Sequence, residues 1–215
     1  IRDEWENRIL LMGIWWVDLI KYSEMNISEM MVLFWHDHFA TSAETVKFTP
    51  SMFIQNKLFR QYATGNFKDL VKSINYDPAM LFWLDNDKNY YINENNNTIN
   101  ENYSRELLEL FTMGEGNYTQ QDIVETARAL TGIDSDGMYS IFSPIRHDHG
   151  LKNILGTIGN HNPEDVIDII FDHQATSRFI CEKLYQWFVY EYPDDEIVNQ
   201  MVDILIDHNF EIEPV

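Results

Sequence analysis

Two copies of the tripeptide His-Asp-His are the residues of this sequence with the clearest capacity for chemistry. They are His36-Asp37-His38 and His147-Asp148-His149. Imidazole nitrogens and carboxylate oxygens are usual ligands of zinc and iron, and such a site can leave one position open for a water molecule. The first hypothesis is therefore a site for a divalent metal cofactor.

The spacing inside each triplet decides which histidines can share an ion. On a helix, residues two apart diverge by about 200°, so His36 and His38 cannot both face the same ion. The second triplet falls in a predicted loop and is less constrained. We therefore predict His38, His147 and Asp148, together with Glu106, as the ligand set of a metal-dependent enzyme such as a hydrolase. The alternative is that His38 is a hydrogen-bonded core residue and the second triplet a hydrogen-bonded turn.

Four charged residues, Arg105, Glu106, Glu109 and Arg128, form the second candidate site. In the simplest interpretation they lie on exposed helix faces, where a pair four residues apart such as Glu101 and Arg105 contributes only about 0.2–0.5 kcal/mol. In the interpretation that we favour, they form a buried ionic lock between two helices, and removal of one partner would cost about 3–5 kcal/mol. General acid–base catalysis ranks third, because an arginine beside a carboxylate lowers its pKa and makes it a poor acid.

The segment Asp85-x-Asp87-x-Asn89 is similar to the first half of a calcium-binding loop. The second half does not fit, because Tyr90 stands in place of the usual glycine and Asn96 in place of the usual glutamate. The sequence also has no glycine-rich phosphate loop, nucleophile elbow or Cys-His pair. A complete catalytic set is therefore missing.

The composition limits the classes of partner. The chain has 215 residues, 45% of them hydrophobic, and a formal net charge of −20, which argues against binding to nucleic acids or anionic membrane surfaces. Its one cysteine, Cys181, excludes an internal disulfide framework, and no apolar run approaches the ~20 residues that span a bilayer. Six Trp, 13 Phe and 11 Tyr predict a tightly packed interior or an exposed interaction face.

Hydrophobic periodicity and capping residues predict a mainly α chain. The expected helices cover approximately residues 5–22, 28–39, 49–65, 67–74, 78–83, 101–114, 119–132, 162–173, 176–190 and 193–208. The segment 85–100 is rich in asparagine and aspartate and is expected to be a long surface loop. The stretch 138–142 is expected to pair with a short strand near 151–155.

The helix expected at 101–114 should lie at the centre of the fold. Its apolar side chains share one arc at 100° per residue: Tyr103, Leu107, Leu108, Leu110 and Phe111. Glu101, Arg105 and Glu109 share the opposite arc, and Glu106 lies at the border. Gly114 should end this helix in a left-handed conformation. A capping box made by Thr119 and Asp122 should begin the next one.

A series of motifs in this order resembles the bacterial domain-of-unknown-function 1800 family. The motifs are Trp35 to Ala40, Arg60 with Gly65-Asn66-Phe67, Asp77 to Leu81, Asn100 to Gly114, Tyr118 to Asp122, Ala127 to Gly132, and His147 to Lys152. Three positions depart from the family pattern: Ser104 replaces alanine, Phe111 replaces the histidine of many members, and Ile133 replaces tryptophan. The resemblance implies a shared fold and no particular reaction, and it implies a longer, exported parent protein.

Together these observations predict one architecture and two functions. The architecture is a single helical domain over residues 1–215, an orthogonal helical bundle with a small irregular or β-hairpin insert near 135–155, and an interior piece of a longer chain. The favoured function is a non-catalytic structural or interaction module of an exported or cell-surface bacterial protein. That module would lie in the periplasm or at the cell surface, with envelope or secreted proteins as partners. The alternative is the metal-dependent enzyme described above.

Overall fold

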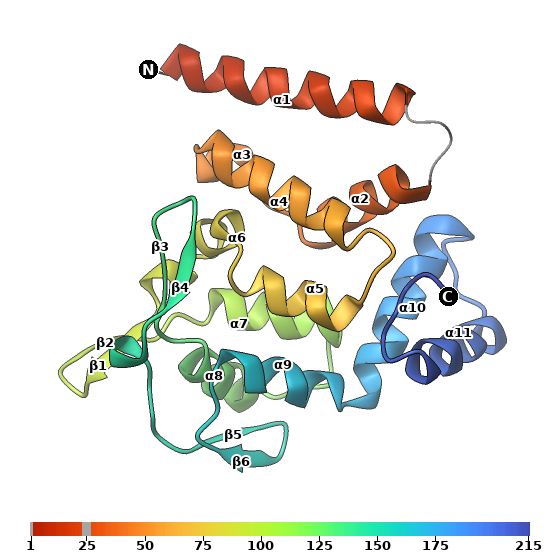
Figure 1. Ribbon diagram of the computed structural model, residues 1–215. Coiled ribbons are helices and arrows are strands. Elements are labelled where there is room, and N and C mark those ends of the chain that lie inside the picture. Colours follow the sequence, from red (N-terminus) through yellow and green to blue (C-terminus); the bar gives the residue numbers. More distant parts are fainter. Residues whose placement is uncertain (1, 23–26) are drawn as a thin grey trace.

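The computed structural model describes residues 2–22 and 27–215, and helices predominate in it, as the composition and periodicity predict (Figure 1). The α-helices are α1 (Arg2–Tyr22), α2 (Ile27–His38), α3 (Ala43–Val46), α4 (Thr49–Gln61), α5 (Phe67–Ile74), α6 (Pro78–Trp83), α7 (Asn102–Glu106), α8 (Gln120–Ala129), α9 (Pro163–Phe171), α10 (Gln174–Phe188) and α11 (Asp195–Asp207). Short strands connect them, together with two 3-10 helices, η1 (Asn86–Lys88) and η3 (Pro144–Arg146), and a π-helix, η2 (Leu107–Thr112). The strands are β1 (Tyr90–Asn93), β2 (Asn96–Thr98), β3 (Ile133–Ser135), β4 (Ser140–Phe142), β5 (Lys152–Ile154) and β6 (Thr157–Gly159).

Most helices begin at the capping residues that the sequence indicates. The side chains of Asn66 and Asp77 accept hydrogen bonds from backbone amides of the first turns of α5 and α6. Thr119 and Asp122 form the predicted capping box of α8. Phe48 precedes α4 with an extended backbone, and Thr49 is the first helical residue. Helix α10 begins two residues before the expected position, because the side chain of His173 accepts from the amide of Ala175 and caps it.

Within residues 2–22 and 27–215 the strands form three separate antiparallel hairpins, each closed by a short local turn, and one isolated bridge joins Asn66 to Glu211. β1 pairs with β2 inside the segment that was expected to be a loop. β3 pairs with β4, and β5 pairs with β6. The predicted pairing of 138–142 with 151–155 is therefore wrong. Each strand has a nearer partner across a turn, at Gly137 or Gly156, which both have positive φ, and closing a short turn loses less chain entropy than closing a long loop.

The central helix changes geometry at its midpoint. After α7 the chain forms a π-helix, η2, in which the amide of Met113 donates to the carbonyl of Leu108, five residues back, at 2.9 Å. The wider turn alters the direction of the side chains that follow. Leu108 and Phe111 remain buried, but Leu110 is 51% exposed. The predicted inward position of Leu110 is therefore wrong, because it assumed a regular α-helix throughout.

A dense aromatic cluster forms the main core. The Trp35 ring stacks on Phe67 with centroids 5.6 Å apart, and its Nε1 donates to the carbonyl of Ala63 at 3.0 Å. Backbone hydrogen bonds from Phe67 to Phe210 (2.9 Å) and from Ile212 to Gly65 (3.1 Å) attach the C-terminal segment to this core.

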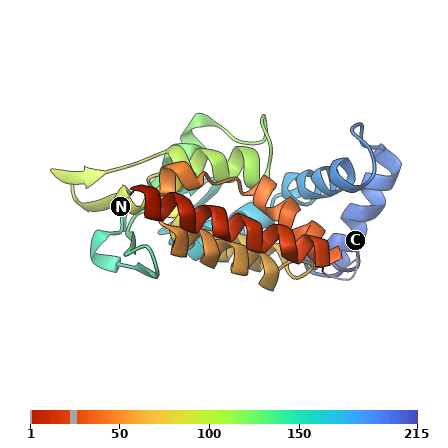
Figure 2. The ribbon, with the colours of Figure 1, turned by 90° about the horizontal axis from the view of Figure 1, so that it is seen from above.

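Helix α1 is the outermost layer on one side of the molecule. It lies above α4 and α2 in Figure 1, and Figure 2 shows it running across the elements beneath it. Ile9 and Met12 of α1 pack on a small second cluster that contains Val46 and Met52. Among the described helices, α1 included, no stretch is both apolar enough and long enough to traverse a bilayer.

Candidate functional site

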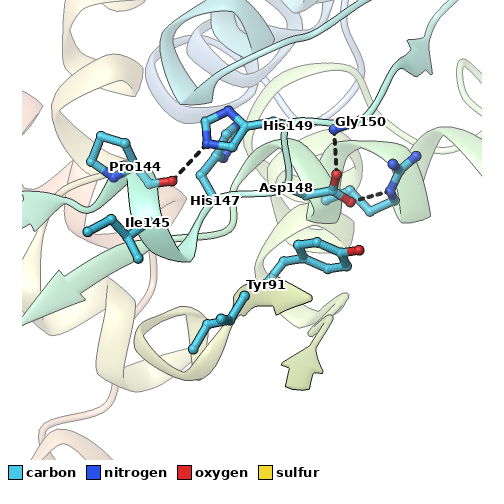
Figure 3. A pocket seen from close by; sticks show the side chains of 9 residues that line it. Tyr91, Pro144, Ile145, His147, Asp148, His149 and Gly150 are labelled. Carbon is cyan, nitrogen blue, oxygen red and sulfur yellow. Dashed lines mark hydrogen bonds and ion pairs between the residues drawn. The ribbon is translucent and has the colours of Figure 1, made fainter. Parts of the chain in front are cut away.

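The second His-Asp-His triplet lies in an open cleft of about 670 Å³ (Figure 3). The cleft lies between the β1–β2 hairpin and the loop that runs from η3 to β5. Its lining residues are Tyr91, Ile92, Arg128, Pro144, Ile145, His147, Asp148, His149 and Gly150. Two of the four predicted metal ligands, His147 and Asp148, therefore line one cavity.

The Asp148 carboxylate is fully engaged in holding the loop. Its Oδ2 accepts from Nε of Arg128 at 2.7 Å, and its Oδ1 accepts from the amide of Gly150 at 2.7 Å. Although desolvation opposes ionisation, the hydrogen bonds from Arg128 and Gly150 hold the pKa of Asp148 below its ordinary value. Arg128 also pairs through Nη1 with Glu125 at 2.6 Å. The Asp148 carboxylate is thus ionised, points toward Arg128 and fixes the loop that forms the cleft wall.

The side chain of Lys152 holds the loop by bonding backbone carbonyl groups. Its side chain is buried, and its ammonium donates to the carbonyl oxygens of Asp148, Gly150 (3.1 Å) and His161 (3.2 Å). An ammonium has three hydrogens, so these three acceptors use its donor capacity. Burial lowers the pKa of Lys152. The residue therefore has a structural role.

The imidazole of His147 has a defined tautomer. Its Nδ1 lies 3.1 Å from the carbonyl oxygen of Thr131 and 3.3 Å from the Thr131 hydroxyl. That hydroxyl donates its proton to the carbonyl of Arg128 at 2.7 Å and accepts from the amide of Asp148 at 2.8 Å. Both neighbours of Nδ1 can then only accept, so Nδ1 carries the proton. Burial lowers the pKa of His147, which favours the neutral ring with an unprotonated Nε2.

Two glycines allow the backbone to close around this network. Gly132 has φ +87°, and a Cβ there would lie 2.7 Å from the carbonyl oxygen of Ser143. A Cβ on Gly150 would lie 2.7 Å from Nη2 of Arg128. The motifs at 127–132 and 147–152, which are separate in the sequence, therefore form one hydrogen-bonded unit.

His38 lies in a different environment. Its Nε2 is 2.9 Å from the carbonyl oxygen of Phe111, and its ring packs against aromatic side chains, including Phe34 with centroids 5.7 Å apart and Phe39 with centroids 4.6 Å apart. Desolvation lowers the pKa of His38 to about 4 despite the hydrogen bond to Phe111. This arrangement matches the hydrogen bond of the alternative, but the side chain is only partly buried and lines a pocket of about 300 Å³ with Leu110 and Lys183. The backbone carbonyl of Phe111 holds the ring.

Glu106 completes the predicted metal set but joins neither histidine. Burial and the nearby Glu109 raise its pKa, and in the described part of the chain it makes no ion pair. Within residues 2–22 and 27–215 no three His, Cys, Asp or Glu side chains are grouped so as to hold a metal ion. The structure therefore does not assemble His38, His147, Asp148 and Glu106 into one ligand set.

The residues of the predicted ionic lock are likewise divided. Arg105 pairs with Glu101 at 3.0 Å on a partly exposed face, Glu109 accepts from the hydroxyl of Tyr118 at 2.7 Å, and Arg128 points into the cleft wall. Arg128 pairs with Glu125 on its own helix, and its partner from a distant segment, which the sequence reasoning missed, is Asp148. The sequence signal for it was the occurrence of both residues in family motifs.

The half calcium loop is part of the scaffold. Nδ2 of Asn89 donates to the carbonyl of Ala127 at 2.8 Å, and its Oδ1 accepts from the amide of Asn100 at 3.1 Å. Asp85 adopts a left-handed conformation and pairs with Lys88. Asn89 thus holds the hairpin against the end of α8 rather than facing an ion.

A second candidate site is the outer surface of α1, where the sequence runs from Ile9 to Val17 without a charged residue. We call Leu10, Ile14 and Val17 the outer stripe. They are 61%, 50% and 61% exposed, and a Cβ built on Gly13 between them would touch nothing within 4 Å. The opposite face of the same helix packs on the molecule. Sequence reasoning missed this exposed outer face, although the uninterrupted apolar run was a signal for it.

A shallow apolar groove of about 510 Å³ borders the outer stripe. It lies between α1 and the start of α4 and is lined by Arg8, Leu11, Met12, Trp15, Thr49, Pro50 and Phe53. The rings of Trp15 and Phe53 are 5.3 Å apart, and Leu11 and Phe53 are 63% and 41% exposed. The outer stripe and this groove form a continuous apolar surface along α1.

A family model described as "Protein of unknown function (DUF1800)" matches residues 3–215, nearly the full length of the chain. No curated protein and no solved structure matches it. The match agrees with the motifs seen in the sequence and provides no reaction, ligand or partner.

Proposed function

The chain belongs to the DUF1800 family, whose description specifies no activity, and on this premise we propose that it is a structural or interaction module that binds another protein through α1. One observation carries the proposal. The middle of α1 is apolar around its circumference, and a helix of that kind is normally covered on all sides. Here the outer stripe is left uncovered within the described residues. Exposed apolar surfaces of this type commonly mark interaction sites.

The spacing of the outer stripe favours a helical partner. Leu10, Ile14 and Val17 are at positions i, i+4 and i+7, which form a ridge on one side of a helix. Gly13 lets a second backbone approach closely, because it has no side chain. Since the chain carries a net charge of −20, the partner that fits best is an amphipathic helix whose apolar face is flanked by lysine or arginine.

We place this module in an exported or cell-surface bacterial protein, with an envelope or secreted protein as its partner. The family resemblance supports this location. Fractionation of cells that express the full-length protein tests it. Recovery in the periplasmic or surface fraction is expected, and recovery with cytoplasmic markers alone contradicts this part of the proposal.

Site-specific photo-crosslinking tests the interaction directly. A photoreactive amino acid at position 14 is expected to capture a partner whose cross-linked peptide, identified by mass spectrometry, is an amphipathic helix with basic flanks. The double variant Ile14→Glu and Val17→Glu is expected to abolish the complex during size-exclusion chromatography. Both side chains are exposed, so this variant should still fold.

The matched control is Ile158→Glu in the β5–β6 hairpin. Ile158 is 71% exposed. The β5–β6 hairpin that carries it lies on the opposite side of the molecule from α1 in Figure 1, so the complex should survive this change. A complex that persists in the Ile14/Val17 variant contradicts the proposal. A cross-link between two copies of the chain would assign the outer stripe to self-association instead of to a partner protein.

The metal-dependent hydrolase is the weaker of the two functions, because its four predicted ligands belong to different parts of the structure. We therefore do not base a function on that set.

A further inference from the structure

The cleft contains two neighbouring imidazoles that each present one unprotonated nitrogen when neutral. For His147 that nitrogen is Nε2, because Nδ1 donates to the carbonyl of Thr131. For His149 it is Nδ1, because Nε2 lies 2.8 Å from the carbonyl oxygen of Pro144, which can only accept. A backbone carbonyl that fixes the proton on one ring nitrogen and frees the other is the usual support of a metal-binding histidine.

The backbone places the two rings on the same side of the loop. His147 has an extended conformation, with φ −95° and ψ 142°, and side chains alternate along extended chain. Asp148 accordingly turns away from the histidines and accepts hydrogen bonds from Arg128 and from the amide of Gly150; Figure 3 shows the bond between Asp148 and Gly150. The histidines on either side of it remain together at the cleft. This is the reverse of the helical triplet, in which residues two apart diverge.

The distance between the two rings fits a shared ion. Their centroids are 5.0 Å apart, and the ring planes are inclined by 81°. With metal–nitrogen bonds of about 2.1 Å, each centroid would lie about 3.2 Å from the ion, and a tetrahedral angle would separate the centroids by about 5.2 Å. The observed separation is close to that value.

The local charges also permit a cation. Arg128 and Asp148 line the cleft and pair with each other. Behind them, Glu125 pairs with Arg128, and the buried Lys152 interacts with both carboxylates. The wall is therefore close to neutral. The protein as a whole carries a charge of −20, so its field attracts cations from solution.

From these observations we propose that His147 and His149 bind one divalent transition metal ion, of the class of Zn²⁺, Ni²⁺ or Cu²⁺, at the mouth of the cleft. Imidazole nitrogens prefer these ions to Mg²⁺ and Ca²⁺. Two protein ligands leave the remaining positions to water or to a small ligand that enters the cleft past Tyr91 and Ile145. Asp148 takes no part in coordination and acts as a positioning residue through its bond to Arg128. This site is independent of the interaction proposed for α1.

Titration calorimetry with zinc sulfate at pH 7.5 and 0.15 M NaCl, in the presence of excess Mg²⁺, tests the site. One ion per chain is expected to bind. His147→Asn and His149→Asn should each weaken the affinity by at least about tenfold, since loss of even an outer-shell partner typically costs 10–100-fold. With Cu²⁺ as probe, the electron paramagnetic resonance spectrum should show coupling to two nitrogens in the parent and to fewer in either variant.

His161→Asn is the matched control. The Nε2 of His161 also lies near a backbone carbonyl, that of Thr157 at 3.1 Å, but this residue lies outside the cleft lining. Its removal should leave the affinity unchanged. His149 is exposed, so His149→Asn remains informative even if His147→Asn fails to fold.

Three results would overturn the proposal. They are the absence of saturable zinc binding in the parent, full affinity in His149→Asn, and an equal loss of affinity in His161→Asn. The last of these would show that zinc binds nonspecifically to the acidic surface.

Discussion

Nε of Arg128 lies 2.7 Å from Oδ2 of Asp148, although 20 residues separate the two in the chain. This bond joins the last turn of α8 to the loop that carries the cleft histidines. Arg128 also bonds Glu125 on its own helix, so its guanidinium is fixed on two sides. The pair links two sequence motifs into one structural unit, and the position of His147 depends on it.

Replacement of Arg128 by Met should destabilise the protein by about 1–3 kcal/mol. The Asp148 side chain is only 8% exposed and would lose its charged partner. Arg128 itself is 25% exposed, so the loss should be smaller than for a fully buried pair. Urea unfolding measures the effect. Arg105→Met is the control, because Arg105 pairs with Glu101 on a more exposed face and should cost about 0.5 kcal/mol or less. Equal losses in the two variants would contradict the assigned role of Arg128.

Gly132 and Gly116 allow a test of how tightly the cleft loop is packed. Both have φ +87°, but a Cβ at Gly132 would lie 2.7 Å from the carbonyl oxygen of Ser143, whereas a Cβ at Gly116 would touch nothing within 4 Å. Gly116→Ala should therefore cost only the strain of a left-handed alanine, about 1 kcal/mol. Gly132→Ala should cost at least about 2 kcal/mol more, because backbone must move. Thermal unfolding of the two variants compares them, and similar losses would show that the loop is loose.

The features that the sequence predicted well depend on near neighbours in the chain. Asn66, Asp77 and Thr119 cap helices by bonding amides within a few residues of themselves, and such patterns are visible in any short window. The helical content and the inner face of α1 follow from periodicity for the same reason. The inward position of His38 was also predictable, because it follows an aromatic pair on α2.

The features that the sequence did not predict depend on contacts between distant segments. The partner of Arg128 could not be chosen among several carboxylates without knowing which loop lies beside α8. Similarly, Nδ1 of His147 carries the proton because the Thr131 hydroxyl already donates to the carbonyl of Arg128 and accepts from the amide of Asp148. Only the folded loop determines these two bonds. The π-helix η2 is a third case, because nothing in the run of residues 107–112 signals a change from four-residue to five-residue hydrogen bonding.

Leucine-to-alanine substitutions in η2 test that change of geometry. Leu108 is fully buried and Leu110 is 51% exposed, whereas a regular α-helix would place both on the apolar face. Leu108→Ala should cost about 2–5 kcal/mol, because it leaves a cavity in the core. Leu110→Ala should change the free energy of unfolding by about 0.5 kcal/mol or less. A large loss for both substitutions would indicate a continuous α-helix.

Asp77 is buried in a way that should make stability depend on pH. Its Oδ2 accepts from the amide of Met80 and from Nε2 of Gln55, each at 2.8 Å, but its buried Oδ1 has no partner among the described residues. Desolvation raises its pKa from 3.8 to about 7, although the hydrogen bonds from Met80 and Gln55 oppose the rise. Between these two pKa values the folded state therefore holds more protons than the unfolded state. Stability from this group is present below the lower value and is lost as the pH rises toward the higher one.

Asp77→Asn should remove this dependence while keeping a side chain that can cap α6. The difference in unfolding free energy between Asp77→Asn and the parent should therefore shift in favour of the variant from pH 4 to pH 7 and then level off. At about 1.4 kcal/mol per pKa unit, the upper limit of this change is about 4 kcal/mol.

Asp122→Asn is a control whose stability should depend on pH with the opposite sign. Desolvation acts to raise the pKa of Asp122, but the hydrogen bonds from Thr119 and Leu155 outweigh it and lower that pKa. The stability that this carboxylate contributes is therefore lost as the pH falls. Urea unfolding at half-unit pH steps gives both curves. If the difference between Asp77→Asn and the parent does not change with pH, the prediction is contradicted. Asp77 would then be ionised in the folded state, with a water molecule bound to Oδ1.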